Sequence, residues 1–209
     1  MSNNLLVYDT ETTGMPDWKN PSDGEQQPHI VQLAACLVDA DSREFLESMD
    51  VIVYPKTWDI PQETVEVHGI TTERARDEGI DEAAALDQFL SMWAKSDKRV
   101  AHNESFDARI IRIGTMRYSN DQIIDGWSQG KENAICTARL ATPILQLPPT
   151  DRMRAARRFH FKTPNLSEAY KFFTGQDLEN AHNAMADVMA CMAVYFGCVD
   201  HQEKEQANG

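Results

Sequence analysis

Two carboxylates with the spacing of a metal site stand near the start of the chain. Asp9 and Glu11 follow the apolar run 5–8, whose residues favour a β-strand. Because side chains alternate between the two faces of a strand, Asp9 and Glu11 point to the same face. Like charges that converge raise each other's pKa and favour a bound cation, and all-oxygen ligands indicate Mg²⁺ or Mn²⁺. The alternative is that both acids are simply solvated at a strand end.

A further acid lies where a later strand gives way to a helix. In the segment Ala101-His102-Asn103-Glu104-Ser105-Phe106-Asp107, Ser105 can cap the helix, which puts Asp107 in its first turn. The helix dipole favours a negative charge at that position. Asp107 therefore either serves the dipole alone or belongs to the same site as the first two acids.

A histidine and an acid stand five residues apart near the C-terminus, at His182 and Asp187. Inside one helix this offset would separate them by roughly 140°, so they could not share a site. If His182 instead lies on the loop before the helix, it can reach the position that Asp187 faces. Asp187 is on the same helical stripe as apolar residues such as Val188 and Cys191, and a carboxylate on that side needs a partner or a metal ion.

Composition limits what kind of protein this is. The 209 residues are 42% hydrophobic, enough for a full core, and we expect one domain over residues 1–200 with a disordered polar tail at 201–209. The formal net charge of −13 argues against a generally basic nucleic-acid-binding surface, although it allows a local basic track. We expect no signal peptide, no membrane span, and a cytoplasmic protein whose cysteines are reduced, namely Cys36, Cys136, Cys191 and Cys198.

The elements that must position these residues follow an order typical of an α/β fold. Strands are predicted at 5–9, 30–38, 45–53, 99–101 and 134–136, with the first three forming an antiparallel meander. Helices are predicted at 62–68, 81–94, 105–118, 137–147, 166–173 and 184–198. Strands first, then strands alternating with helices, imply a mixed sheet with helices packed on it.

Taken together, the motifs resemble a known family. Asp9-Thr10-Glu11-Thr12-Thr13-Gly14, then His102-Asn103 to Phe106-Asp107, then His182 with Asp187 match in order the motifs of the DEDDh 3′-to-5′ exonucleases, which include the proofreading subunit of bacterial DNA polymerase III. The resemblance spans residues 9–187 and implies an RNase H-like fold, with a mixed five-stranded sheet flanked by helices. The loop at 15–28 is long for the family, and 152–162 matches no family motif.

The resemblance also implies how the site works. Asp9, Glu11, Asp107 and Asp187 hold two Mg²⁺ or Mn²⁺ ions, and His182 takes the proton from the attacking water. The product is a nucleoside 5′-monophosphate. The residues expected to bind substrate beside the terminal nucleotide are Thr12, Thr13, His68, Ile70, Asn103 and Phe106.

Several functions are compatible with this set of residues. We expect a metal-dependent exonuclease that acts on single-stranded 3′ ends, DNA more than RNA. The alternatives are a proofreading subunit bound to a DNA polymerase, an RNA or oligoribonucleotide exonuclease, and a catalytically silent binding module. The silent module is disfavoured because each expected catalytic residue is present.

A basic segment could hold the backbone of the substrate. Residues 152–162 carry five of the 20 Lys and Arg residues of the chain, interleaved with Phe159, His160 and Phe161. Arg154, Arg157 and Arg158 are the candidate backbone contacts. The alternative is a solvated helix face with Phe159 or Phe161 in the core.

Overall fold

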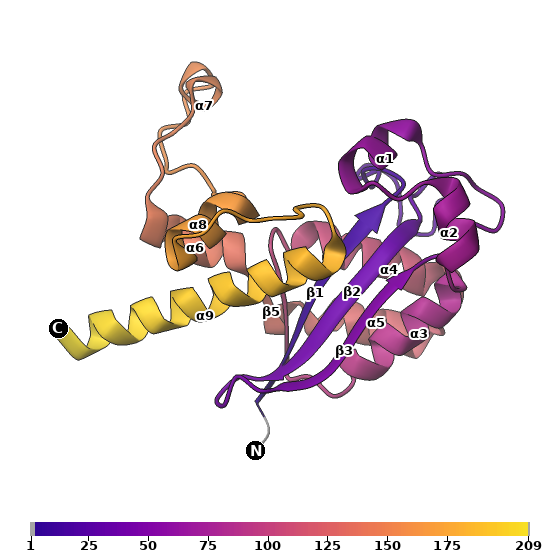
Figure 1. Cartoon of the computed structure of the whole chain (residues 1–209), viewed down its shortest axis with the longest axis horizontal. Helices are drawn as coiled ribbons and strands as arrows, with labels where there is room; N and C mark the ends of the chain where they lie inside the picture. The colour runs from indigo at the N-terminus through magenta and orange to yellow at the C-terminus, as the bar shows by residue number, and fades with distance from the viewer. Residues whose placement is uncertain (1–2, 209) are drawn as a thin grey trace.

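The computed structural model describes residues 3–208, and its centre is a five-stranded sheet (Figure 1). The strands are β1 (Asn4–Thr12), β2 (Ile30–Asp39), β3 (Phe45–Ile52), β4 (Lys98–Ala101) and β5 (Ala134–Cys136). Their order across the sheet is β3-β2-β1-β4-β5. Strands β1, β2 and β3 pair antiparallel, whereas β4 and β5 continue parallel to β1. The mixed five-stranded sheet predicted from the sequence is therefore confirmed.

Helices flank the sheet on both faces. They are α1 (Gln62–His68), α2 (Thr72–Glu78), α3 (Glu82–Trp93), α4 (Ser105–Tyr118), α5 (Asp121–Gln129), α6 (Thr137–Leu145), α7 (Asp151–Ala155), α8 (Leu166–Thr174) and α9 (Ala184–Asn208). Sequence patterns did not predict α2, α5 and α7. Each of these three begins at a side chain that accepts a hydrogen bond from the first turn, which are Thr71, Asn120 and Thr150. Such caps are the signal that could have located them.

Two apolar clusters separate the faces of the sheet. On one face, Tyr8 of β1 packs with Phe89 of α3, Ile110 of α4 and Trp127 of α5. On the other face, Val7 of β1 belongs to the cluster that includes residues from the start of α9. In Figure 1, α9 crosses one face of the sheet while α3, α4 and α5 lie behind it. The alternation along β1 thus sends neighbouring side chains to different helix layers.

Helix α9 continues past the core to Asn208, where a disordered tail was expected from residue 201. The residues from Gln202 to Ala207 are exposed, yet they include no glycine or proline and are good helix formers. His201 and Glu205 form an i,i+4 pair at 3.4 Å. The polar segment is therefore helical up to Asn208, and Gly209 lies outside the described residues.

Two further expectations concern the thiols and the membrane. Cys36, Cys136, Cys191 and Cys198 are all free, as the sequence predicts. Within residues 3–208, no helix combines the length and the apolar character needed to cross a membrane.

Candidate active site

Strand β1 presents Asp9 and Glu11 to the face that α9 covers. In the β1–β2 register, Asp9 lies opposite Ala34, and Glu11 lies opposite Gln32. Ala34 belongs to the apolar cluster that includes the start of α9. Because directly paired residues point to the same side of a sheet, both acids face the first turn of α9.

Two side chains fix where α9 begins. Gln32 Oε1 accepts a hydrogen bond from the Ala184 N–H at 3.1 Å, and Gln32 Nε2 donates to Asp50 at 2.7 Å. Asn183 Oδ1 accepts from the Ala186 N–H at 3.1 Å and caps the first turn. Gln32 was not among the residues predicted to matter. A polar residue in the apolar run of β2 was the available signal, since a buried amide needs partners.

His182 lies on the loop before α9, so the five-residue offset does not separate it from Asp187. Its backbone φ of 69° belongs to the left-handed region that few residues other than glycine adopt. In this conformation the His182 N–H donates to Asp187 Oδ2 at 3.0 Å. His182 is exposed, and a nitrogen of its imidazole lies near carboxylate oxygens of Glu11 and Asp187.

Three of the predicted residues meet closely enough to hold a cation. Ligand atoms of Glu11, His182 and Asp187 all lie within 4.8 Å of one another. Asp187 Oδ1 is buried and has no hydrogen-bond partner within the described residues. An unpaired buried carboxylate oxygen is costly, and a bound cation removes that cost. Asp9 and Asp107 are not part of this closest group of three.

Asp107 approaches from the opposite side of β1. It lies in the first turn of α4 and is only 2% exposed. Its Oδ1 accepts hydrogen bonds from the Thr10 N–H at 3.0 Å and from Thr10 Oγ1 at 2.9 Å. These bonds fix the carboxylate against Thr10, the residue that lies between Asp9 and Glu11 in β1. Asp107 therefore combines its place at a helix N-terminus with hydrogen bonds to β1, and its part in a metal site stays a prediction.

The pKa values of all four acids are raised. Burial raises the pKa of Asp9 well above its usual range, and the charges of Asp107, Asp187 and Glu11 raise it further. Burial, with Asp187 and Asp107, raises the pKa of Glu11 to about 8. Burial also raises the pKa of Asp107 to about 7 despite the bonds from Thr10, and raises that of Asp187. Such shifts mark a place where negative charge is crowded, which suits divalent cations and their oxygen ligands.

His68 lies beside this acidic cluster. Burial lowers its pKa; the Thr12 backbone partly opposes this, and His182 lowers it further. His68 Nδ1 accepts from the Ile70 N–H at 3.1 Å, so the neutral ring carries its proton on Nε2. That Nε2 is buried and has no partner within residues 3–208. Gly69 ends α1 directly after His68 with a φ of 74°.

The other expected substrate contacts differ in exposure. Thr12 Oγ1 donates to the Gly14 carbonyl at 2.8 Å, and Thr13 Oγ1 accepts from the His29 N–H at 3.0 Å. Ile70 is 2% exposed and packs in a small core with Val31 and Ile60, so its side chain does not reach the site surface.

Asn103 lies in the turn that leads into α4, and Phe106 lies in the first turn of that helix. Asn103 is exposed with a φ of 64°, and its carbonyl accepts from the Phe106 N–H at 2.9 Å. Phe106 is half-buried against the main core. Phe106 therefore directly precedes Asp107 in α4, and Asn103 lies just before the helix.

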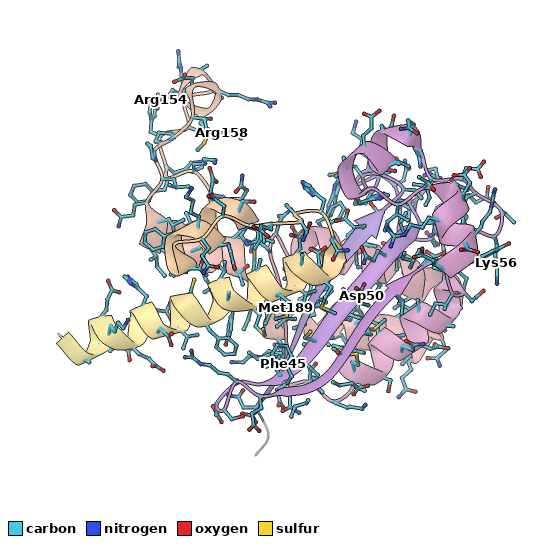
Figure 2. The ribbon with its side chains drawn as sticks, viewed as in Figure 1. Phe45, Asp50, Lys56, Arg154, Arg158 and Met189 are labelled. Atoms are coloured by element: carbon cyan, nitrogen blue, oxygen red, sulfur yellow. The ribbon has the colours of Figure 1, made fainter. Side chains whose placement is uncertain are left out.

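The basic segment forms a projecting arm, residues 148–164, called the basic arm below. In Figure 1 it leaves the body between α6 and α8 and carries α7 at its tip, where Figure 2 labels Arg154 and Arg158. Phe159 is 72% exposed and Phe161 44%, so neither lies in the core as the alternative required. At its base the Lys162 N–H donates to the Leu147 carbonyl at 2.9 Å.

Comparisons with known proteins agree with this fold. A family model described as RNase_T exonuclease matches residues 6–195. Among proteins with curated descriptions, none matches the chain by sequence.

Solved structures of E. coli exonuclease I share the fold. Its complex with a dT13 oligonucleotide superposes with a TM-score of 0.72 at 22% identity, over 99% of this chain and 43% of that chain. Its zinc-bound complex with single-stranded DNA gives 0.70 at 22% identity, over 97% and 42%. Its SSB-Ct complex gives 0.72 at 21% identity, over 98% and 42%.

This chain spans less than half the length of those solved proteins, and the superposition confirms the RNase H-like fold predicted from the sequence. The family model reaches from β1 into α9 and thus includes all five candidate catalytic residues. The chain belongs to the RNase_T exonuclease family, enzymes that hydrolyse nucleic acids from an end.

Proposed function

We propose that this protein hydrolyses single-stranded DNA from its 3′ end and releases nucleoside 5′-monophosphates. The observation that carries the proposal is the meeting of Glu11, His182 and Asp187, with an unpartnered carboxylate oxygen among them. The proposal is supported by structural neighbours that were solved with dT13 and dA16 oligonucleotides.

The residues divide the reaction between binding and proton transfer. Asp9, Glu11, Asp107 and Asp187 would hold divalent ions, which would stabilise the negative charge on the attacking and leaving oxygens. The exposed His182 imidazole takes the proton of the water that attacks the terminal phosphorus. As the water oxygen bonds to phosphorus, the bond to the 3′ oxygen breaks, and that oxygen is protonated. Thr10 holds Asp107 in place throughout.

We propose Mg²⁺ or Mn²⁺, two per site, as the ions. The carboxylate majority of the cluster favours hard cations. The histidine among the closest ligand atoms also suits zinc, and one solved E. coli relative was crystallised with zinc. Activity with each metal after removal of bound ions by chelator tests the assignment. Full activity in chelator would refute any metal mechanism.

The basic arm is proposed to contact the backbone of longer substrates. Arg152, Arg157 and Arg158 are exposed, and no carboxylate lies within 4.0 Å of them in the part of the chain that the structure describes. In Figure 1 the arm and α1 both extend beyond the end of the sheet where β1 finishes. A nucleic-acid strand that leaves the active site can therefore follow the basic arm, with its phosphates near the arginines and a base near Phe159.

Changing Arg154, Arg157 and Arg158 together to Gln tests the arm. Binding of a long oligonucleotide should weaken, and the log-log salt slope should fall by roughly 0.7 for each lost phosphate contact. Cleavage of a dinucleotide, too short to reach the arm, should be unchanged. Equal losses on both lengths would show that the arm supports the active site itself.

A panel of 3′-labelled and 5′-labelled substrates decides the nucleic acid and the polarity. It comprises single-stranded DNA, blunt and mismatched duplex DNA, single-stranded RNA and a dinucleotide. Stepwise shortening from the 3′ end of single-stranded DNA, faster than RNA, is the expected result. Co-purification with a DNA polymerase, with a mismatch preference, would indicate a proofreading subunit instead. We place the protein in the cytoplasm, where the four free thiols stay reduced.

A further inference from the structure

A pocket of about 580 Å³ lies on the far side of α4 from the acidic cluster. Ser105, Ala108, Arg109 and Arg112 form its α4 wall, and this i, i+3, i+4, i+7 spacing defines one helix face. Asp107 faces Thr10 from another side of the same helix. The pocket and the active site are therefore separated by α4, and the volume suits a small ligand.

The lining of the pocket is basic, whereas the chain as a whole is acidic. Its lining includes five basic residues, which are Arg99, Arg109, Arg112, Lys131 and Arg139, and one acidic residue, Glu104. Over the whole chain, 33 Asp and Glu residues outnumber 20 Lys and Arg residues. Such a local excess of positive charge, in a chain of net charge −13, favours an anionic ligand.

Most of that positive charge is unpaired. Arg99 neutralises Glu104 with a 2.9 Å ion pair and stacks 3.9 Å from the centre of the Trp127 ring. Among residues 3–208, no carboxylate lies within 4.0 Å of the other four basic side chains. Arg109 uses Nη2 to bind the Asp17 and Asn20 carbonyls, which ties the loop that carries Trp18 to α4.

Three buried donor atoms at the pocket lack partners. Arg109 Nε, Arg112 Nε and Ser128 Oγ are buried without a hydrogen bond within the described residues. All three belong to residues that line the pocket. A buried N–H of a charged group that stays unpaired is costly, so the hydrogen-bonding capacity of these lining residues is not fully used within the protein. Asp187 Oδ1 gives the same signal for a cation at the active site.

An aromatic surface stands next to the arginines. Trp18 is 56% exposed, lines the pocket, and its ring centre lies 5.9 Å from the Arg109 guanidinium. Guanidinium groups bind phosphate oxygens in pairs, and an exposed indole offers a face on which a nucleobase can stack. A carboxylate-rich peptide would use the charge but would leave the indole without a planar partner.

We propose that this pocket is a second, non-catalytic site that binds the phosphate of a nucleotide, with the base on Trp18. The guanidinium groups of Arg112 and Arg139 bind the phosphate. The choice of a nucleotide rests on the proposed function, whereas the phosphate site rests on the pocket alone. The phosphate comes from a free nucleoside 5′-monophosphate or from the strand backbone.

Calorimetry on the full chain in chelator tests the proposal, with dTMP, inorganic phosphate and dT8 as probes. Chelator removes the ions that would hold a phosphate among the acids of the active site. Arg112→Gln combined with Arg139→Gln should weaken binding of dTMP and of phosphate by about tenfold or more. Trp18→Ala should weaken dTMP by about tenfold and leave phosphate unchanged.

Matched variants locate the binding. Arg74→Gln removes one exposed positive charge from α2 and should change nothing. Asp107→Asn should abolish nuclease activity but not dTMP binding, so failure of the proposed reaction and failure of the phosphate site are separate results. The double variant should keep its circular dichroism spectrum and its rate on a dinucleotide.

The outcomes assign the source or overturn the site. If the double variant loses binding of dTMP alone, the ligand of the pocket is a free nucleotide. If it also loses binding of dT8, the ligand is the backbone of a nucleic-acid strand. Binding that is absent in the parent, or equal in the double variant, overturns the phosphate site. An Asp- and Glu-rich peptide that binds the parent more tightly than dTMP, and not the double variant, overturns the nucleotide assignment.

Discussion

Glu11→Gln should make the metal-free protein more stable while it removes activity. Glu11 lies near three other acids, and burial, with the charges of Asp187 and Asp107, raises its pKa from 4.5 to about 8. A shift of that size corresponds to about 5 kcal/mol in full. Since Glu11 is partly exposed, solvent screening reduces the expected gain to about 2 kcal/mol. For a chain of 209 residues this is a rise in Tm of about 4 to 8 °C.

The pH dependence has a definite sign. A carboxyl whose pKa is raised by folding is protonated in both states below pH 4.5 and ionised in both above about 8. The unfolding free energy of the parent therefore falls as pH rises between these values, because Glu11 must ionise in the folded state. The glutamine variant has no such loss, because its side chain does not ionise. The difference in unfolding free energy should be near zero at pH 4.5 and reach about 2 kcal/mol near pH 8.5.

Denaturant unfolding in chelator across this pH range measures the difference, and added Mg²⁺ should stabilise the parent more than the variant. Glu66→Gln on the exposed face of α1 is the matched control, because it removes the same charge away from the cluster. If Glu11→Gln is no more stable than Glu66→Gln at pH 8.5, the reasoning is refuted, because the ionised Glu11 carboxylate then does not destabilise the metal-free site.

Three other predictions concern positioning, proton transfer and the core. Thr10→Val removes one of the bonds that hold Asp107 and should lower kcat about tenfold with little change in KM or Tm; an unchanged kcat would make the bond incidental. His182→Ala should lower kcat by about 10²- to 10⁴-fold with unchanged Mn²⁺ affinity by calorimetry, whereas weaker Mn²⁺ binding would make His182 a ligand. Glu82→Ala leaves the Ile30 N–H and Tyr118 hydroxyl unpaired and should lower the unfolding free energy by about 3 to 5 kcal/mol in denaturant titration; a loss below 1 kcal/mol would contradict this.

Strong local periodicity made most of the fold predictable. The strand at 30–38 and the helices at 81–94 and 105–118 are found within one residue of the predicted bounds. The apolar spacing and the capping residues that define these elements lie within a few positions of one another, so they can be recognised in a single sequence. Helices such as α7, which has no buried residue, have no apolar face to detect.

Parts of the site depend on contacts that local patterns do not encode. The bond between Thr10 and Asp107 joins residues 97 positions apart, and the one between Gln32 and Ala184 spans 152 positions. The placement of His182 was predictable, because the helical offset excluded a shared site inside the helix. The arginine pocket was not, since Arg99 and Arg139 meet only after β4, β5 and α6 have packed.

The length of α9 has a consequence for local stability. Its first turn is tied to the sheet through Gln32, whereas residues 202–207, which follow the buried Cys198 and the Arg43–Asp200 ion pair, are exposed. Amide hydrogen exchange should therefore be slow around Asp187 and fast beyond His201. The helix beyond His201 can therefore unfold locally without moving the Asp187 carboxylate, so one helix combines a rigid first turn with an end that opens readily.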